Sequence, residues 1–393
     1  MSDTFNTPPL TDMKVIEIGQ IAAGPFAGML LADLGADVVK IEKPETGDGM
    51  RDWPPLRVNK TGNTYSGNFA SLNRNKRSVV IDFKDSKQLN KLKKLCQEAD
   101  VVIENYRPGV LKKFSLDYES LKQENPKLIY CSISGFGHIG PYAEKGAFDV
   151  TIQAISGLMS VTGEKEGDPV KSGVPVGDFV AALYGAYSIV SSFLKVKRTN
   201  KGAYIDCSML GGLLGISALQ TSEYYGTGES PKRLGTAHPR NAPYQGYHAK
   251  DRPFVVAAGN DGLWKKVCYI CGVPELINDK RFINQSLRAK NQEELNEILK
   301  PIFLKKTSKE WLKKFDEKGI PCAPINSFEE VLQDTHVKEM NIINETKLPN
   351  GIRTNDIGFP VKISGFEYKI FKYAPKLGEH NQEVFSEWFE ESD

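Results

Sequence analysis

Short apolar strands alternate with helical segments through the first half of the chain. Residues 13–19 (MKVIEIG) and 36–44 (ADVVKIEKP) are strand-like, and residues 24–35 (GPFAGMLLADLG) have helical apolar spacing. A strand, a helix and a strand within about 30 residues form a parallel βαβ unit. Further strands are predicted at 76–83, 99–109, 126–137 and 203–210. The pattern predicts an α/β domain around a mostly parallel sheet.

The chain changes in composition after residue 222. Residues 223–244 are rich in Gly, Pro and polar residues, residues 247–260 resemble a hairpin, and residues 262–334 are mainly helical. The sequence from 335 onward is irregular. Because 393 residues exceed one ordinary core, we expect a large domain with a smaller companion.

The net charge and the hydropathy of the chain limit the kinds of molecule that the protein is expected to bind. The 51 Lys and Arg nearly balance the 49 Asp and Glu, so no overall field favours nucleic acid or an anionic membrane. No apolar run reaches the roughly 18–20 residues that a membrane helix needs, and the polar start MSDTFNTPPL lacks a signal pattern. We expect a cytoplasmic protein that binds neither nucleic acid nor a membrane.

Six cysteines are too few for a disulfide framework in a chain of this length. Cys268 and Cys271 have the CxxC spacing of a redox pair, but their apolar neighbours favour a helix whose cysteines fill a core. No second CxxC or HxxxH accompanies them, so no metal site is expected.

The turn GQIAAGP at 19–25 joins the first strand to the first helix. Such turns bring backbone amides towards a phosphate, and Glu42 ends the next strand, where a dinucleotide-binding fold often has its ribose-binding acid. A dehydrogenase is therefore a competing hypothesis. The GxGxxG motif is absent, because residues 20–23 separate Gly19 from Gly24. The alternative is a plain connection whose small residues pack closely.

Three cations, Arg74, Lys76 and Arg77, fall within LNRNKRS at 72–78. Ligands of parallel sheets bind outside the carboxyl ends of the strands, and several cations gathered there would suit a polyphosphate. A solvated charge cluster is the alternative interpretation. Other cations lie at or just after predicted strand ends: Lys43, Arg107, Lys112 and Lys113.

A lone acid, Asp178, stands among small and apolar residues in GVPVGDFVAALYG, residues 173–185. Asp is a favoured N-cap, and an apolar helix follows it, so capping is one interpretation. A helix N-terminus also stabilises the charged form of a carboxylate, which suits a nucleophile. Asp149 is a second candidate acid, with hydrogen bonding as its expected role.

His238 lies in the loop GTAHPRNAPY, close to Arg233 and Arg240. A loop histidine between two arginines is a candidate contact for an acidic substrate, and an ordinary exposed histidine is the alternative. No Ser–His–Asp pattern, GxSxG or HExxH is present in the sequence.

Several stretches resemble the family III CoA-transferases, also called the CaiB/BaiF family. The resemblance covers nearly the whole chain, and the order of the stretches makes it specific. In chain order they are EIGQIAAGPFAGMLLADLGADVVKIEKPETGD, LNRNKRS, VVIENYRPGVL, SISGFGHIGPY, FDVTIQAISGLMSVTG, GVPVGDF, NKGAYIDCSML, GTAHPRNAPYQGY, GIPCAPIN and APKLGEH.

This resemblance implies a fold and a CoA site. It implies a large Rossmann-like domain at 1–222, a smaller α+β domain with linkers at 223–334, and a segment at 335–393 returning to the large domain. Two such subunits interlock as a homodimer. Lys43 and Lys113 stand where some relatives carry arginine, so phosphate contacts there lose bidentate geometry. The family's CoA-binding positions fall on Gln20, Ile21, Ala22, Ala23, Lys43, Leu72, Asn73, Arg74, Asn75, Lys76, Asn105, Tyr106, Arg107, Lys113, Ser134, Gly135, Phe136 and Gly137.

The resemblance also implies covalent catalysis on Asp178, where the family's catalytic aspartate falls. CoA or an acyl-CoA is then a substrate, no cofactor is bound permanently, and the second substrate is a carboxylic acid. Backbone amides near Gly235 are candidates for stabilising the oxyanions. Arg233, His238 and Arg240 are candidate contacts for the distal carboxylate of a dicarboxylic acid, since this loop most resembles the branch that uses succinyl-CoA.

Two alternatives on the same scaffold stay open. Acyl-CoA racemases resemble this chain but carry a histidine just before the acid at 149, where this sequence has Phe148. Without that histidine, one partner for α-proton exchange is missing. A non-catalytic acyl-CoA-binding protein is the other alternative, and the retention of Asp178 argues against it.

Overall fold

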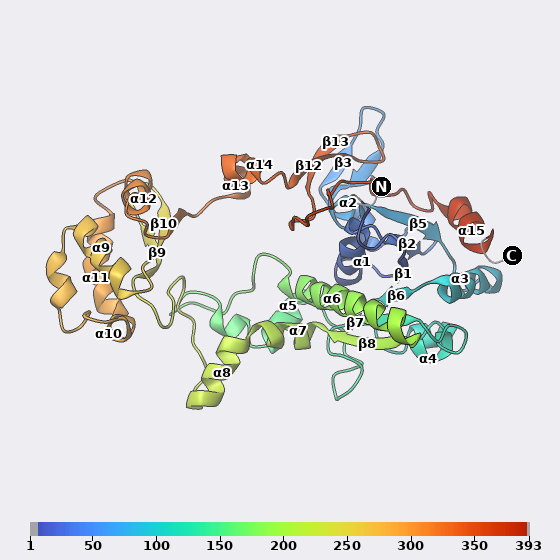
Figure 1. Cartoon of the computed structure of the whole chain (residues 1–393), viewed down its shortest axis with the longest axis horizontal. Coiled ribbons are helices and arrows are strands. Elements are labelled where there is room, and N and C mark those ends of the chain that lie inside the picture. The colour runs from blue at the N-terminus through green and yellow to red at the C-terminus, as the bar shows by residue number, and fades with distance from the viewer. Residues whose placement is uncertain (1–6, 391–393) are drawn as a thin grey trace. The chain divides into compact units, whose positions relative to one another are not determined.

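The computed structural model describes residues 7–390, which divide into two units. The first unit contains the residues up to Leu158, Lys171–Glu229 and the chain from His336 onward. The second contains Met159–Val170 and Ser230–Thr335, and Figure 1 colours both by residue number. Residues 159–170 thus group with the second unit, although the sequence assigned them to the large domain.

A six-stranded sheet forms the centre of the first unit, and each neighbouring pair of its strands is parallel. The direction of winding reverses between β1 and β6. The carboxyl ends of these two strands therefore flank a topological switch point. In spatial order the strands are β5 (Lys76–Val80), β2 (Asp37–Glu42), β1 (Lys14–Ile18), β6 (Val101–Glu104), β7 (Ile129–Ser134) and β8 (Ala203–Ser208).

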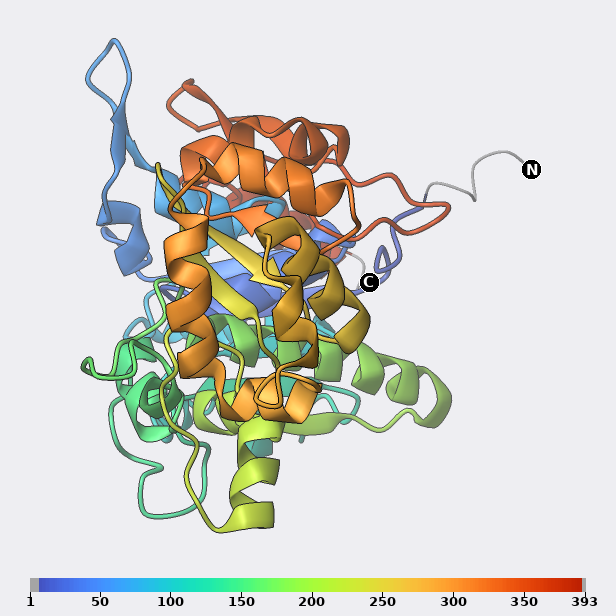
Figure 2. The ribbon, with the colours of Figure 1, turned by 90° about the vertical axis from the view of Figure 1, so that its left-hand side faces the viewer.

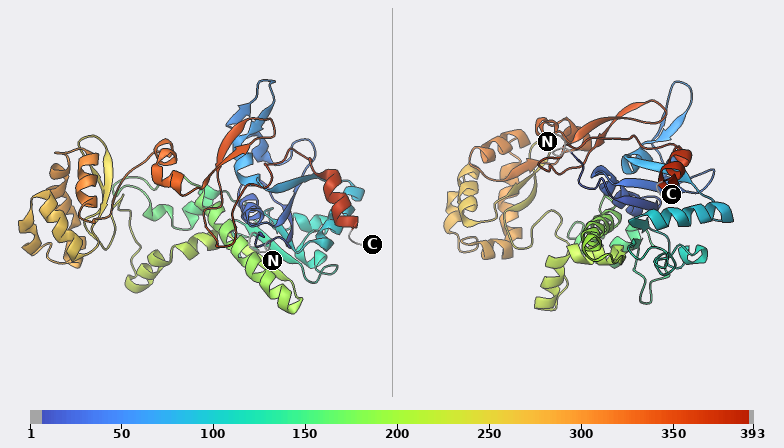
Figure 3. Two further views of the ribbon diagram at one scale, coloured as in Figure 1. Left: turned by 45° about the horizontal axis from the view of Figure 1, so that its top comes forward. Right: turned by 45° about the vertical axis from the view of Figure 1, so that its right-hand side comes forward.

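Both faces of this sheet are covered, because its strands are apolar on both sides. Val15 and Val38 belong to one core, and the adjoining residues Ile16 and Val39 belong to the other. The helices on the first face are α1 (Ala23–Asp33) and α6 (Val176–Thr199). Those on the second are α3 (Ser86–Glu98) and α15 (Asn381–Glu390), which lie side by side in Figure 3.

Helix α6 corrects the expectation that no apolar run is long enough for a membrane. It has 24 residues, and its most apolar 18-residue window has a mean hydropathy of 1.5. Its buried residues, among them Ala182, Ile189 and Phe193, pack against the sheet core. Packing against the sheet accounts for the apolar residues on the buried face of α6, and one helix of sufficient length and composition is weak evidence for membrane insertion.

Smaller elements complete the first unit. The helix predicted at 146–163 is shorter, because Gly157 at φ 85° follows α5 (Asp149–Ile155). The C-terminal part is less irregular than expected, since β12 (Ile343–Lys347) and β13 (Arg353–Ile357) form an antiparallel hairpin. The others are β3 (Leu56–Val58), β4 (Thr64–Ser66), α2 (Gly67–Asn73), α4 (Tyr118–Leu121), α7 (Met209–Ile216), α8 (Ala218–Thr227) and α14 (Thr335–Glu339).

The second unit has its own core around a three-stranded antiparallel sheet, ordered β11-β10-β9. Trp264, Phe254 and Trp311 are buried in it. Cys268 and Cys271 lie on α9 against this core, and burial raises the pKa of both thiols to about 12, as structural cysteines require. The elements, seen in Figure 2, are β9 (Tyr244–His248), β10 (Pro253–Ala257), α9 (Asp261–Cys271), α10 (Gln285–Lys290), α11 (Gln292–Phe303), α12 (Ser308–Asp316), β11 (Cys322–Pro324) and α13 (Phe328–Gln333).

Candidate active site

A cavity of about 420 Å³ lies at the switch point of the first unit. Its walls include the segments that follow β1, β6 and β7, which are adjacent strands of the sheet. Ligands of open parallel sheets bind at this place. Of the residues predicted from the sequence, the lining contains Gln20, Ile21, Ala22, Ala23, Asn105, Tyr106, Arg107, Ser134, Gly135 and Asp178.

Two hydrogen bonds made by the side-chain amide of Asn105 join the loop after β6 to the loop after β1. Asn105 Oδ1 accepts the N–H of Gln20 at 2.9 Å, and Asn105 Nδ2 donates to the Gln20 carbonyl at 2.9 Å. A Cβ at Gly24 would lie 3.1 Å from the Asn105 side chain, so the glycine permits this contact. No side chain caps α1, and Ala22 and Ala23 line the cavity, so the first N–H groups of the helix are available to an anion.

Asp178 lies in the first turn of α6 and is not the N-cap that the sequence predicted. The N-cap is Pro175 and the helix begins at Val176, so Asp178 is its third residue. The start of the helix is held instead by Asp149, whose Oδ1 accepts the N–H of Gly177 at 2.8 Å. Asp178 is partly buried in the cavity wall, and within residues 7–390 no hydrogen bond to its carboxylate is found.

The environment of Asp178 changes its acidity. Burial, and to a smaller extent the neighbouring Asp149 charge, together raise the pKa of its carboxyl to about 6. We expected the helix start to stabilise the charged form, so the direction is opposite, because desolvation and a like charge dominate. Above neutral pH a group with this pKa is still mostly ionised. Asp178 therefore combines the charge of a carboxylate with raised basicity, which suits a nucleophile.

Two cations line the cavity, and the sequence identified one of them. Arg107 follows β6, and it packs so closely on Gly146 that a Cβ there would lie 2.6 Å from its Nη2. Lys145, which the sequence analysis missed, lies on the loop after β7 with its Nζ 3.8 Å from the Tyr142 ring centroid. Its position after a strand that ends at the switch point is the signal that would have found it.

The cations of LNRNKRS do not line this cavity, and they are not solvated either. Arg74 donates to Asp33 at 2.6 Å and to Asp356 at 2.8 Å, both within the first unit. Lys76 is fully buried, 2.7 Å from Glu17. Internal carboxylates therefore neutralise these cations, so the solvated-cluster interpretation is wrong for these side chains, and their contribution to a polyphosphate site stays a prediction. Leu72, Asn73 and Asn75 are buried beside them.

Four further predicted residues lie at strand ends but outside the cavity lining. Lys43 after β2 and Lys113 beyond β6 are both exposed. Phe136 packs against Tyr142 with ring centroids 5.5 Å apart, and Gly137 donates its N–H to Ser134 Oγ at 2.9 Å.

The predicted substrate residues belong to the second unit. The N–H of Gly235 donates to the Gly163 carbonyl at 2.9 Å, so this amide is engaged within its own unit and is not free for an oxyanion. His238 stacks on Tyr244 with ring centroids 4.9 Å apart, and its Nδ1 accepts the Arg240 N–H at 3.1 Å. Burial, and then the Arg240 charge, lower the pKa of His238. Arg233 donates to the carbonyl of Gly167 at 2.8 Å.

Comparison with known proteins agrees with the resemblance read from the sequence. The profile of CoA-transferase family III matches residues 10–381. A succinate–glutarate CoA-transferase of Agrobacterium fabrum is 37% identical over 98% of both chains. The human succinyl-CoA:glutarate CoA-transferase is 36% identical over 98% of this chain and 87% of its own.

A solved structure agrees over the whole fold. The crystal structure of a CaiB/BaiF family protein from Brucella suis superposes with a TM-score of 0.87 at 39% identity, covering 98% of this chain and all of that one. Profile, sequence and structure thus agree along nearly the entire length. The chain belongs to the family III CoA-transferases and is an enzyme of the CoA-transferase type.

Proposed function

We propose that this enzyme moves CoA from succinyl-CoA, or a similar dicarboxylic acyl-CoA, to a free carboxylic acid through Asp178. The observation that carries the mechanism is the Asp178 carboxylate, which lies in the wall of the switch-point cavity without a hydrogen-bond partner among the described residues. The choice of donor rests on the relatives, since those of Agrobacterium fabrum and human are named for succinate or succinyl-CoA and glutarate.

The proposed cycle consists of four acyl exchanges. The Asp178 carboxylate attacks the donor thioester carbon, the C–S bond breaks, and a mixed anhydride and CoA thiolate form. The thiolate attacks Cγ of Asp178 and releases the donor acid, which leaves an aspartyl-CoA thioester. The acceptor carboxylate then attacks Cγ and expels the thiolate. Finally the thiolate attacks the acceptor acyl carbon and restores the Asp178 carboxylate. No proton or water is consumed.

The groups that line the cavity suit both the binding of CoA and the attack of Asp178 on the thioester. Arg107 and Lys145 supply positive charge for the phosphates of CoA, and the uncapped start of α1 supplies N–H groups for anionic oxygen. Raised basicity at Asp178 favours its attack on the thioester. Racemisation is disfavoured, because Phe148, beside the candidate acid Asp149, lines the cavity and offers no proton-transfer group.

Oxygen labelling tests this cycle directly. With an 18O-labelled acceptor acid, one label must enter Asp178 in each turnover. Because the two carboxylate oxygens of Asp178 are equivalent, about half of that label should leave with the donor acid released in the next turnover and the rest in later turnovers. Mass spectrometry of the Asp178 peptide and of the free acids measures both. Net CoA transfer without label in Asp178 would contradict the covalent route, and no transfer from succinyl-CoA to any acid of a broad panel would contradict the donor assignment.

We also propose that the enzyme is a homodimer. Helix α6 leaves Tyr187 and Leu194 at 72% and 61% exposure, and Tyr225 on α8 is 84% exposed. Tyr187 and Leu194 are seven residues apart and therefore share one face of α6, and exposed apolar side chains gathered on one face mark a protein interface. A homodimer, interlocked as in the family, would cover them.

A further inference from the structure

Ile21, in the wall of the cavity, has an unusual backbone conformation. Its φ is 68°, in the left-handed region, which is unfavourable for a β-branched residue. Such a conformation persists only where the surrounding structure over-determines it, and residues of this kind gather at functional sites. Ile21 immediately precedes Ala22 and Ala23, which also line the cavity and begin α1. Contacts from elsewhere in the fold must therefore keep the Ile21 backbone in this conformation.

Asp48 holds the backbone of Ile21. Both carboxylate oxygens of Asp48 accept the Ile21 N–H, at 3.0 and 3.1 Å, and Oδ1 also accepts the Met50 N–H at 2.9 Å. The Ile21 side chain packs on the same loop, since a Cβ at Gly49 would lie 3.3 Å from Ile21 Cδ1. The loop around Asp48 thus grips both the main chain and the side chain of the strained residue.

Lys40 fixes Asp48 from inside the fold. Its ammonium group is fully buried, 2.9 Å from Asp48 Oδ2 and 2.9 Å from Glu17 Oε1, and it donates to the Gly19 carbonyl at 2.9 Å. Burial would raise the pKa of Asp48, but the Lys40 charge and the backbone N–H donors outweigh it and hold that pKa below its ordinary value. Lys40 therefore joins the loop after β1 to the Asp48 loop.

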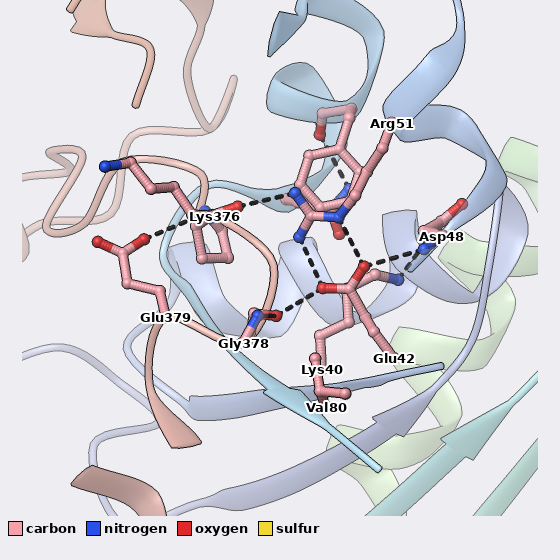
Figure 4. Close-up of polar contacts among 12 residues, drawn as sticks. Lys40, Glu42, Asp48, Arg51, Val80, Lys376, Gly378 and Glu379 are labelled. Atoms are coloured by element: carbon pink, nitrogen blue, oxygen red, sulfur yellow. Dashed lines mark hydrogen bonds and ion pairs between the residues drawn. The ribbon is translucent and has the colours of Figure 1, made fainter. Parts of the chain in front are cut away.

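The Asp48 loop is itself braced by the C-terminal segment, as Figure 4 shows. Glu42 accepts the Asp48 N–H at 3.0 Å and two donors of Arg51, at 2.8 and 2.6 Å. Arg51 in turn donates to the Pro375 carbonyl at 3.1 Å. The Gly378 N–H reaches Glu42 through the Ser78 hydroxyl, at 2.9 and 2.6 Å. Asp48 is thus a rigid support rather than a mobile surface acid.

We propose that Asp48 is a positioning residue of the transferase: anchored by Lys40, it holds Ile21 in the left-handed conformation and thereby sets residues 20–23 against the acyl-CoA. Asp48 touches no substrate in this proposal and acts through the backbone of Ile21. The inference rests on the proposed function, because it takes the cavity as the acyl-CoA site.

Asp48→Asn is the first test. Asparagine keeps the shape and one acceptor oxygen, but it places an amide where Lys40 requires a carboxylate oxygen. We expect the KM for succinyl-CoA to rise on the order of tenfold, with the larger part of the loss in KM rather than kcat. Asp52→Asn is the matched control, since Asp52 is exposed on the same loop, and its KM should stay at the wild-type value. An unchanged KM in Asp48→Asn overturns the proposal.

Ile21→Gly separates positioning from a general structural role. Glycine adopts a positive φ at no steric cost, so a backbone without strain needs less support. The KM penalty of Asp48→Asn should therefore be smaller in the Ile21→Gly background than in the wild type. Equal penalties in both backgrounds overturn the proposal. If Asp48→Asn does not fold, soluble folded Asp48→Asn/Ile21→Gly supports it, and insolubility of both overturns it.

Failure of the proposed function gives a different result. A wild-type enzyme that transfers no CoA from succinyl-CoA overturns the proposed donor, and this inference with it. A wild type that turns over normally beside an Asp48→Asn variant of unchanged KM overturns the role of Asp48 alone.

Discussion

The carboxylate of Asp149 accepts the backbone N–H of Gly177 at 2.8 Å, one residue before Asp178. Gln153 donates to the other Asp149 oxygen at 2.6 Å and keeps the carboxylate in place. The same acid contributes, after burial, to the raised pKa of Asp178. One residue therefore both orients the start of α6 and adjusts the charge state of Asp178. The hydrogen bond needs an oxygen, whereas the electrostatic effect needs a charge, so the two can be separated.

Asp149→Asn is expected to shift the acid limb of the kcat/KM profile to lower pH. In the wild type the rate should fall as the pH drops below about 6, because Asp178 becomes protonated. The amide keeps an oxygen for Gly177 but removes the negative charge that disfavours ionisation of Asp178. Glu144→Gln removes an exposed charge from the preceding loop and should leave the limb in place. An acid limb that stays put in Asp149→Asn would contradict the electrostatic role.

Asp178→Asn is expected to lower kcat by about 10⁴-fold or more, since the nucleophile is lost. The same variant should unfold at a higher temperature than the wild type at pH 8. The folded-state pKa of Asp178 is about 6, above its ordinary 3.8, so the unfolded chain loses this proton first as the pH rises. As the pH rises from 3.8 to about 6, the wild type therefore loses stability relative to the variant. At any pH above about 6 the whole of this loss is present.

Thermal unfolding at pH 8 and near pH 4 measures this difference. The variant should gain a few degrees at pH 8 and lose most of that gain at the lower pH, where both side chains are uncharged. Circular dichroism at both pH values serves as the control for folding. A variant that is less stable than the wild type at pH 8 would show that the Asp178 charge is stabilised in the folded protein.

The strands of the sheet could be predicted well from the sequence, whereas the roles of the charged side chains could not, and the difference has a physical reason. Strands buried on both faces, such as Asp37–Glu42, contain short apolar runs, here Val38, Val39 and Ile41, that a short window reveals. The role of a cation depends on partners far away in the chain. Arg74 pairs with Asp33 and Asp356, and no local pattern reports either contact. The capping of α6 by Asp149, which displaced Asp178 from the predicted cap, is long-range in the same way.

Arg74→Ala is expected to destabilise the protein by about 3–5 kcal/mol, because it leaves the buried Asp33 carboxylate without its cation. Lys43→Ala is the comparison, since Lys43 is exposed, and such surface changes usually stay within about 0.5 kcal/mol. Denaturant unfolding followed by fluorescence measures both. If Arg74→Ala retains wild-type stability and raises the KM for acyl-CoA instead, the original assignment of Arg74 to the CoA site is restored.

Arg107→Ala and Lys145→Ala are each expected to raise the KM for succinyl-CoA on the order of tenfold while changing kcat less, because a lost charged hydrogen bond to phosphate weakens binding. Lys113→Ala tests whether an exposed cation outside the lining also takes part. Initial rates at low and high salt measure the effect, which should shrink as salt screens the charges. Equal KM values for Lys145→Ala and the wild type would remove Lys145 from the site.

Tyr187→Glu is expected to weaken the homodimer, because Tyr187 is exposed on the apolar face of α6 together with Leu183 and Leu194. A carboxylate placed in a dry interface is desolvated without a partner, whereas the same charge on an open surface costs little. Lys195→Glu on the same helix introduces a negative charge at an exposed polar position and serves as the control. Interlocked subunits separate only on unfolding, so light scattering after refolding from denaturant at a series of protein concentrations measures the mass of both. We expect Tyr187→Glu alone to refold with a lower mass, and a mass that matches Lys195→Glu at every concentration would place the partner surface elsewhere.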